Sequence, residues 1–131
     1  MENKEELKGE LLNKIKEVEK DIEKLLKEAL SEAGFELEGW EITTMGTISD
    51  FWLIVYASKN GKTYRYSFGF SIPDPEYIEW VADELGVSVK ELEEDTELLD
   101  LAWYYIFANE VRDFLDEQAW EIDWEQGGLE I

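Results

Sequence analysis

Carboxylates are the side chains of this sequence whose number and spacing could do chemistry. The chain holds 33 Asp and Glu against 12 Lys and Arg, which gives 131 residues a net charge of −21. Towards the C-terminal end acids recur every three or four residues, at Glu110, Asp113, Glu117 and Glu121. Side chains at that spacing share one face of a helix, with Cβ atoms roughly 5–6 Å apart. The spacing predicts a row of negative charge, the acidic row.

A second group of acids precedes the acidic row. This acidic cluster consists of Asp83, Glu84, Glu91, Glu93, Glu94 and Asp95. Both groups lie in residues 73–131, which hold nineteen acids and two bases, a net charge of −17. Residues 1–34 carry −3 and residues 35–72 carry −1. Because the acidity is regional, we predict that both groups bind a partner.

The residue types that are missing exclude most enzymes. The chain has no Cys and no His, so it lacks thiolate nucleophiles, imidazole bases and the usual zinc ligands. A general base would have to be a carboxylate of raised pKa, and no pair of acids is singled out by its spacing. We therefore predict no catalytic residue, no bound metal and no cofactor.

The charge also limits the partners. Nucleic acids and anionic membranes are bound through Lys and Arg, and both would repel this chain. The first ten residues are charged throughout, and no stretch approaches eighteen uncharged apolar residues. We expect no signal peptide, no membrane span and a cytoplasmic location, that of the host cell if the protein is phage-encoded.

The first element that the pattern predicts is one long helix over residues 4–33, ended by Gly34. Its apolar stripe consists of Leu11, Ile15, Val18, Ile22, Leu25 and Ala29. We interpret the stripe as the face of an amphipathic helix that lies across a sheet. A coiled-coil seam, which would make a homodimer, is the alternative.

Residues 35–72 read as three antiparallel strands. Asn60 and Gly61 separate two alternating runs, as a two-residue type I′ hairpin requires. That turn pairs Lys59 with Lys62 and places an apolar pair, Val55 with Tyr66, on the buried face. An earlier strand through Trp40 and Ile42 completes the meander, with a slip in its alternation at Gly39.

Helices return after Pro73. We predict a helix capped by Asp74 and stopped by Gly86, a short helix over 89–94 that opens on a Ser88–Glu91 capping box, and a long helix over 96–121. Residues 122–131, with Gly127 and Gly128, read as a flexible tail. The chain is then a single α+β domain in the order αβββααα: helix 1–34, sheet 35–72, and an acidic part 73–121 whose three helices pack on one sheet face.

One stretch resembles a known DNA-binding motif. Residues 78–92 place Val81, Ala82, Leu85 and Gly86 where helix-turn-helix proteins have their apolar positions and turn glycine. The resemblance implies a second helix that enters the major groove of DNA. In this sequence that helix carries one base and four acids over residues 88–95, so the DNA-reading role does not carry over.

The tryptophans are the remaining candidates for partner-binding residues. Trp52, Trp80 and Trp103 lie in mostly apolar runs and read as core or near-core residues. Trp120 and Trp124 stand among acids, so they are either rings folded back on the sheet or aromatic anchors for a basic protein.

Two functions fit these features. In the first, the acids occupy a basic, nucleic-acid-binding surface of another protein and inhibit it. Carboxylates three or four residues apart on a helix rise by a few ångströms each, which is commensurate with one phosphate per about 3.4 Å of axis along each DNA strand. In overall composition the chain resembles small acidic anti-restriction and anti-CRISPR inhibitors of phages and the immunity proteins of nuclease toxins. In the second, a dimeric acidic chaperone or adaptor binds a peptide through two apolar surfaces, the long N-terminal helix and the outer sheet face of Trp52, Ile54 and Tyr56. The acids would then serve only solubility.

Overall fold

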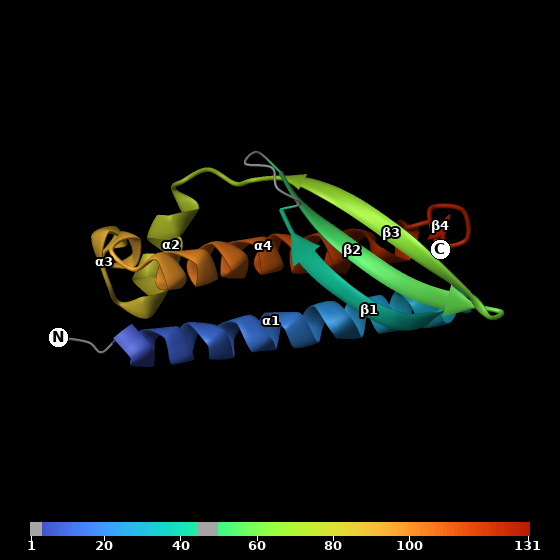
Figure 1. The fold of residues 1–131 in the computed structure, drawn as a ribbon, viewed down its shortest axis with the longest axis horizontal. Coiled ribbons are helices and arrows are strands. Elements are labelled where there is room, and N and C mark those ends of the chain that lie inside the picture. The colour runs from blue at the N-terminus through green and yellow to red at the C-terminus, as the bar shows by residue number, and fades with distance from the viewer. Residues whose placement is uncertain (1–3, 45–49) are drawn as a thin grey trace.

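The computed structural model describes residues 4–44 and 50–131. Its elements, shown in Figure 1, follow in chain order: α1 (Lys4–Glu32), β1 (Glu36–Thr43), β2 (Asp50–Lys59), β3 (Lys62–Ser71), α2 (Tyr77–Leu85), α3 (Val89–Glu93), α4 (Thr96–Gln118), a 3₁₀ turn (Ala119–Glu121) and β4 (Leu129–Glu130). The predicted α+β class and the order of helices and strands are confirmed.

The sheet is antiparallel throughout, in the order β1-β2-β3-β4. The hairpin has the predicted register, with Lys59 opposite Lys62 and Val55 opposite Tyr66. Asn60 and Gly61 have φ angles of 55° and 78°, the left-handed values that a type I′ turn needs. The slip expected at Gly39 is a register shift between Leu37 and Gly39.

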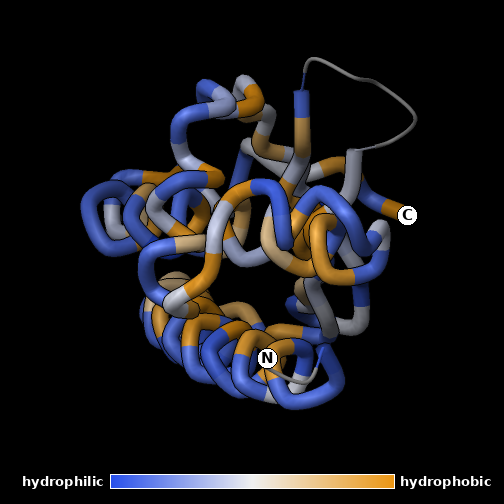
Figure 2. Tube along the Cα trace, turned by 90° about the vertical axis from the view of Figure 1, so that its left-hand side faces the viewer, coloured by the Kyte–Doolittle hydropathy of each residue, from blue (hydrophilic) through white to orange (hydrophobic). Residues whose placement is uncertain are grey.

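The two long helices lie side by side and run in the same direction beneath the sheet (Figure 1). Phe51 of β2 stacks on Phe107 of α4 with ring centroids 4.3 Å apart, and Phe70 of β3 meets Phe114 at 5.2 Å. In Figure 2 the hydrophobic side of α1 faces inward and its hydrophilic side faces outward. The core therefore lies between the sheet and the helix pair.

The apolar stripe of α1 is used inside the chain. Its buried residues are Leu7, Leu11, Ile15, Val18, Ile22, Leu26, Ala29 and Leu30, so Leu26 and Leu30 replace the predicted Leu25 in the last turns. Leu25 is only partly buried. Because this stripe packs against α4 and the sheet, it is not free to form the seam of a coiled-coil dimer.

The helical part differs from expectation at its first cap. The helix α2 begins at Tyr77, after a turn in which the carbonyls of Asp74 and Pro75 accept the amides of Tyr77 and Ile78. Glu76 is the N-cap residue and makes no side-chain cap, so the prediction of an Asp74 cap was wrong. The chain leaves α2 through Gly86, with φ 72°.

Of the three helices that follow the β2–β3 hairpin, α4 is the one that packs against the sheet. The helices α2 and α3 lie at the other end of the molecule, next to the first half of α4 (Figure 1). The α2–α3 pair matches the resemblance to a helix-turn-helix in order, but α3 has five residues, too few to reach along a DNA groove. Within the described residues no helix combines the length and apolarity needed to cross a membrane.

The interpretation of residues 122–131 as a flexible tail was wrong. After the 3₁₀ turn the chain folds back, and β4 pairs with β3 at Tyr64 and Arg65. Gly128 passes so close to the ring of Tyr66 that an added Cβ would lie 2.7 Å from two of its carbons. Gly128 therefore permits a close approach to the sheet, which a larger residue would block.

Candidate functional site

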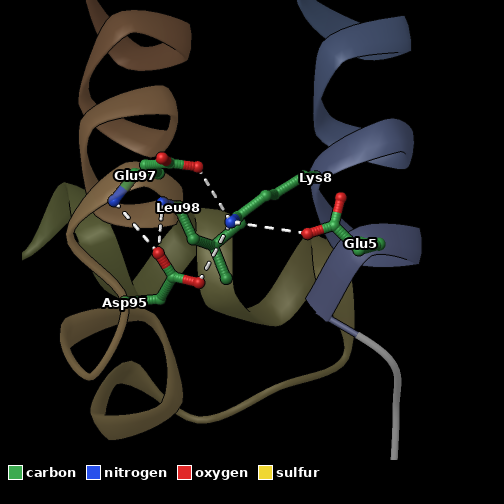
Figure 3. A network of polar contacts seen from close by, with 5 residues as sticks. All are labelled: Glu5, Lys8, Asp95, Glu97 and Leu98. Carbon is green, nitrogen blue, oxygen red and sulfur yellow. Dashed lines mark hydrogen bonds and ion pairs between the residues drawn. The ribbon is translucent and has the colours of Figure 1, made fainter.

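The acidic residues singled out by their spacing fall into two kinds once the fold is known: those with partners inside the protein and those without. Among the first, Asp95 caps α4, since its Oδ1 accepts the amides of Glu97 at 3.0 Å and Leu98 at 3.3 Å. Its other oxygen lies 3.2 Å from the ammonium of Lys8, which also meets Glu97 at 3.0 Å and Glu5 at 3.9 Å (Figure 3).

The pKa values agree with this arrangement. The amide of Leu98 and the ammonium of Lys8 lower the pKa of Asp95 below its usual range, although burial opposes them. Hydrogen bonds to Glu97 and Asp95 raise the pKa of Lys8. Asp95 thus fastens the start of α4 to the start of α1, and of the whole acidic cluster it is the member least free to bind a partner.

Three more acids have partners inside the protein. Ser88 caps α3, since its Oγ accepts the amide of Glu91 at 3.2 Å, and the same hydroxyl donates to the Glu91 carboxylate at 3.3 Å in place of the backbone contact of a full capping box. Glu84 accepts the hydroxyl of Tyr105 at 3.0 Å and lies 4.0 Å from the ammonium of Lys14. Asp113 lies 3.4 Å from the guanidinium of its neighbour Arg112.

The side chains of the other candidate acids make no hydrogen bond or ion pair within the described part of the chain. They are Asp83, Glu93 and Glu94 of the acidic cluster and Glu110, Glu117 and Glu121 of the acidic row. All are exposed except Glu110, which is half-buried. These are the carboxylates that a basic surface could pair with at no cost to the fold.

A groove brings one end of the acidic row together with α2. This α2–α4 groove has a volume of about 460 Å³. It is lined by Glu76, Tyr77 and Trp80 from α2 and by Ile106, Asn109, Glu110, Arg112 and Asp113 from α4. The groove therefore contains two members of the acidic row, Glu110 and Asp113, and no member of the acidic cluster.

Two aromatic rings are exposed at this groove. Tyr77 is 43% exposed and Trp80 is 39% exposed, so the expectation of a core position for Trp80 was wrong. The indole of Trp80 stacks on Tyr105 with centroids 5.4 Å apart and planes 11° from parallel. Burial and the neighbouring Glu84 raise the pKa of Tyr105, whose hydroxyl stays protonated as the donor to Glu84. The Trp80 ring is therefore held in place from one side while it lines the groove.

Glu110 is the carboxylate most affected by its surroundings. Partial burial raises its pKa above the ordinary value, and repulsion from Asp113 one turn away adds to the shift. The side-chain amide of the neighbouring Asn109 is engaged elsewhere, because it donates to the carbonyl of Tyr105 at 2.8 Å. A half-buried carboxylate without a partner would be stabilised by any cation that enters the groove.

The two C-terminal tryptophans, Trp120 and Trp124, differ in their exposure to solvent. Trp120 is 54% exposed on the 3₁₀ turn, whereas Trp124 is 4% exposed. The ring of Trp124 meets those of Tyr66 at 4.9 Å and Phe68 at 6.0 Å. Trp124 is a core residue, which removes it from the candidate partner-binding residues, and Trp120 does not line the α2–α4 groove.

Sequence reasoning missed Glu76, Tyr77 and Trp80 as site residues. A signal was present, because Tyr77 and Trp80 are three residues apart and share a face of α2. Trp80 comes directly before Val81 of the buried stripe, which turns it about 100° away from that stripe. A large ring at such a position either packs on a neighbouring helix or faces solvent, and Trp80 does both.

A larger hollow, of about 980 Å³, lies between the last turns of α1 and the start of β1. Its walls are mainly charged side chains of both signs, such as Lys27, Glu28 and Glu32. Its one aromatic ring, that of Phe35, is buried, so we place the candidate site in the α2–α4 groove, where two rings are exposed.

The groove presents carboxylates, two aromatic rings, an amide and one guanidinium. Across the described residues, no group of three or more acidic side chains converges as metal ligands would. Comparisons with protein-family models, with curated proteins and with solved structures found no match to this chain.

The raised pKa of Glu110 leads to a prediction about the stability of the protein. An acid whose pKa is higher in the folded state opposes folding once it ionises, and this penalty is complete above the raised pKa. We expect Glu110→Gln to increase the free energy of unfolding at pH 7, by no more than about 0.5 kcal/mol, as is usual for surface changes. The gain should vanish below the ordinary Glu pKa of about 4.3. Urea unfolding at several pH values measures it.

Glu117→Gln is the matched control, since it removes the same charge from an exposed position on the same helix. Equal gains for both variants would show that general charge repulsion, and not the position of Glu110, is responsible.

Proposed function

We propose that this protein is an acidic inhibitor that occupies a basic, nucleic-acid-binding surface of another protein. The observation that carries the proposal is the α2–α4 groove, in which Glu76 and Glu110 have no ion pair within the described residues and line the same walls as two exposed aromatic rings. Acids alone would serve solubility. Acids around exposed rings are what a basic partner with anchoring side chains requires.

The distribution of charge supports this function. The helical part after residue 72 carries −17 of the total −21, and its rigid helices hold the carboxylates in fixed positions. Charges of one sign on a folded surface steer an oppositely charged protein and raise its association rate. A surface that normally receives phosphates has the matching charge.

Capture from host-cell extract at two salt concentrations tests the proposal. At about 0.1 M salt the Debye length is about 10 Å, and at about 1 M it is about 3 Å, so capture should fail at the higher salt. The retained protein, once purified, should bind duplex DNA or RNA. The present protein should block that binding, and excess nucleic acid should displace it. A retained partner with no affinity for nucleic acid would contradict the proposal.

A peptide-binding adaptor remains the second candidate. The sheet face opposite the core carries Trp52 and Tyr56, both half-buried, and Leu129, which is 72% exposed next to Arg65. Ile54 on this face is only 1% exposed, which reduces the apolar area on offer. Because such binding would be apolar, it should persist at about 1 M salt, and the capture experiment separates the two candidates.

A further inference from the structure

We propose that the α2–α4 groove receives an arginine side chain, whose guanidinium lies on the ring of Trp80 and pairs with Glu110. This inference deepens the proposed function and rests on it, because the arginine would belong to the basic surface of the partner. It assigns an anchoring role to the groove and leaves the exposed acids of α3 and of the later turns of α4 to longer-range attraction.

The first argument is size. At about 460 Å³ the groove is at the lower end of the range of ligand pockets, about 300–1,000 Å³. It accommodates one extended side chain and is too small for a helix of the partner. Its lining is mainly apolar on the inside, with Ile106 and the rings of Tyr77 and Trp80, which suits the methylene stem of a long side chain.

The second argument is the ring. Cations prefer the face of tryptophan over other aromatic rings, and arginine makes this contact more often than lysine. Its planar, weakly hydrated guanidinium can stack and form hydrogen bonds at the same time. Since Tyr105 already holds the Trp80 indole in one orientation, little side-chain entropy would be lost on binding.

The third argument is charge. The lining carries three acids, Glu76, Glu110 and Asp113, and one base, Arg112. The guanidinium of Arg112 is engaged by Asp113 at 3.4 Å and lies 4.0 Å from Asp21 of α1. Glu110 and Glu76 remain without an ion pair in the described part of the chain. Arg112 is thus already engaged by Asp113 and Asp21, and the lining keeps a net negative charge at Glu76 and Glu110.

The test uses small probes and needs no partner. Titration of the ¹⁵N-labelled protein with N-acetyl-arginine amide should shift the indole resonance of Trp80 in a saturable way. N-acetyl-lysine amide, with the same charge, should bind at least about threefold more weakly, because its ammonium cannot stack. Trp120 is exposed but outside the groove, so its indole resonance serves as an internal control and should not move.

Two variants and one control complete the test. Trp80→Leu identifies the resonance and should abolish the arginine-specific response, read from the backbone amides of α2. Glu110→Gln should weaken binding of the arginine probe about three- to fivefold, the size expected for a partly exposed ion pair. Glu117→Gln should leave it unchanged. Glu110→Gln is not expected to impair folding, so a loss of binding there cannot be attributed to unfolding.

The outcomes separate this inference from the proposed function. Equal responses to arginine, lysine and N-acetyl-leucine amide, or shifts at Trp120 as large as at Trp80, would overturn the arginine site. If that happens while the protein still blocks a nucleic-acid-binding partner, the proposed function stands alone. If the arginine probe binds as expected and the captured partner has no affinity for nucleic acid, the groove assignment stands and the mimic function is wrong.

Discussion

Trp124→Ala is expected to lower the free energy of unfolding by about 3–5 kcal/mol, the usual cost of removing a large buried ring. Trp124 is 4% exposed and contacts Tyr66 and Phe68 at the sheet. Its backbone carbonyl accepts the hydroxyl of Tyr66, so the same residue fixes the returning chain in two ways. Burial raises the pKa of Tyr66 to about 12, which keeps that hydroxyl protonated as a donor at neutral pH.

Denaturant unfolding followed by circular dichroism measures the loss. Trp120→Ala is the matched control, because it removes the same side chain from the same segment at a position that is 54% exposed. The control should cost less than about 1 kcal/mol. Similar losses at the two positions would mean that residues 119–130 do not pack on the sheet as the structure describes.

Reversal of charge at the groove is expected to have the largest effect on partner binding. The double variant Glu110→Lys with Asp113→Lys places two cations beside Trp80, where we propose that a cation of the partner binds. Loss of a partly desolvated charge pair costs about 2–5 kcal/mol at an interface, so affinity should fall at least about thirtyfold. Calorimetry or surface plasmon resonance with the captured partner gives the number.

The matched control reverses two acids elsewhere. Glu10 and Glu17 are exposed on α1 and do not line the groove, so Glu10→Lys with Glu17→Lys makes the same change in net charge. This control should slow association modestly, since it weakens only long-range attraction. If both double variants lose affinity equally, net charge and not the α2–α4 groove determines binding.

A second pair of reversals maps the extent of the surface. Glu93 and Glu94 lie on the α3 side, without ion pairs in the described part of the chain. An effect of Glu93→Lys with Glu94→Lys close to that of the Glu10–Glu17 control would limit the contact to the groove. An intermediate effect would extend it over α3.

Local signals in the sequence were sufficient wherever neighbours in the chain set the geometry. Asn60 and Gly61 fixed the hairpin register, because only a few turns accept positive φ at both central positions. The predicted Ser88 cap of α3 is also local, since its Oγ accepts the amide of Glu91, three residues away. The apolar stripe of α1 was predicted up to its last turns, where Leu26 and Leu30 replaced Leu25.

Local signals misled where the same residue can serve two purposes. Gly127 and Gly128 indicated a loose end, but their missing side chains permit close packing instead: a Cβ on Gly127 would lie 2.7 Å from the carbonyl oxygen of Asp123. Glycine marks both flexibility and close approach, and only the position of Tyr66 distinguishes the two for Gly128.

The sequence by itself determined the α+β order of elements up to α4, the register of the β2–β3 hairpin and the regional charge of −17, because each depends on composition or on residues close together in the chain. Only the tertiary structure decided which acids are engaged within the fold, that Trp124 is buried and Trp120 exposed, and that Trp80 and Glu110 line the same groove. Those facts depend on how α2 and the returning chain pack against α4 and the sheet. The side chains that create them are far apart in sequence, where no periodic pattern can connect them.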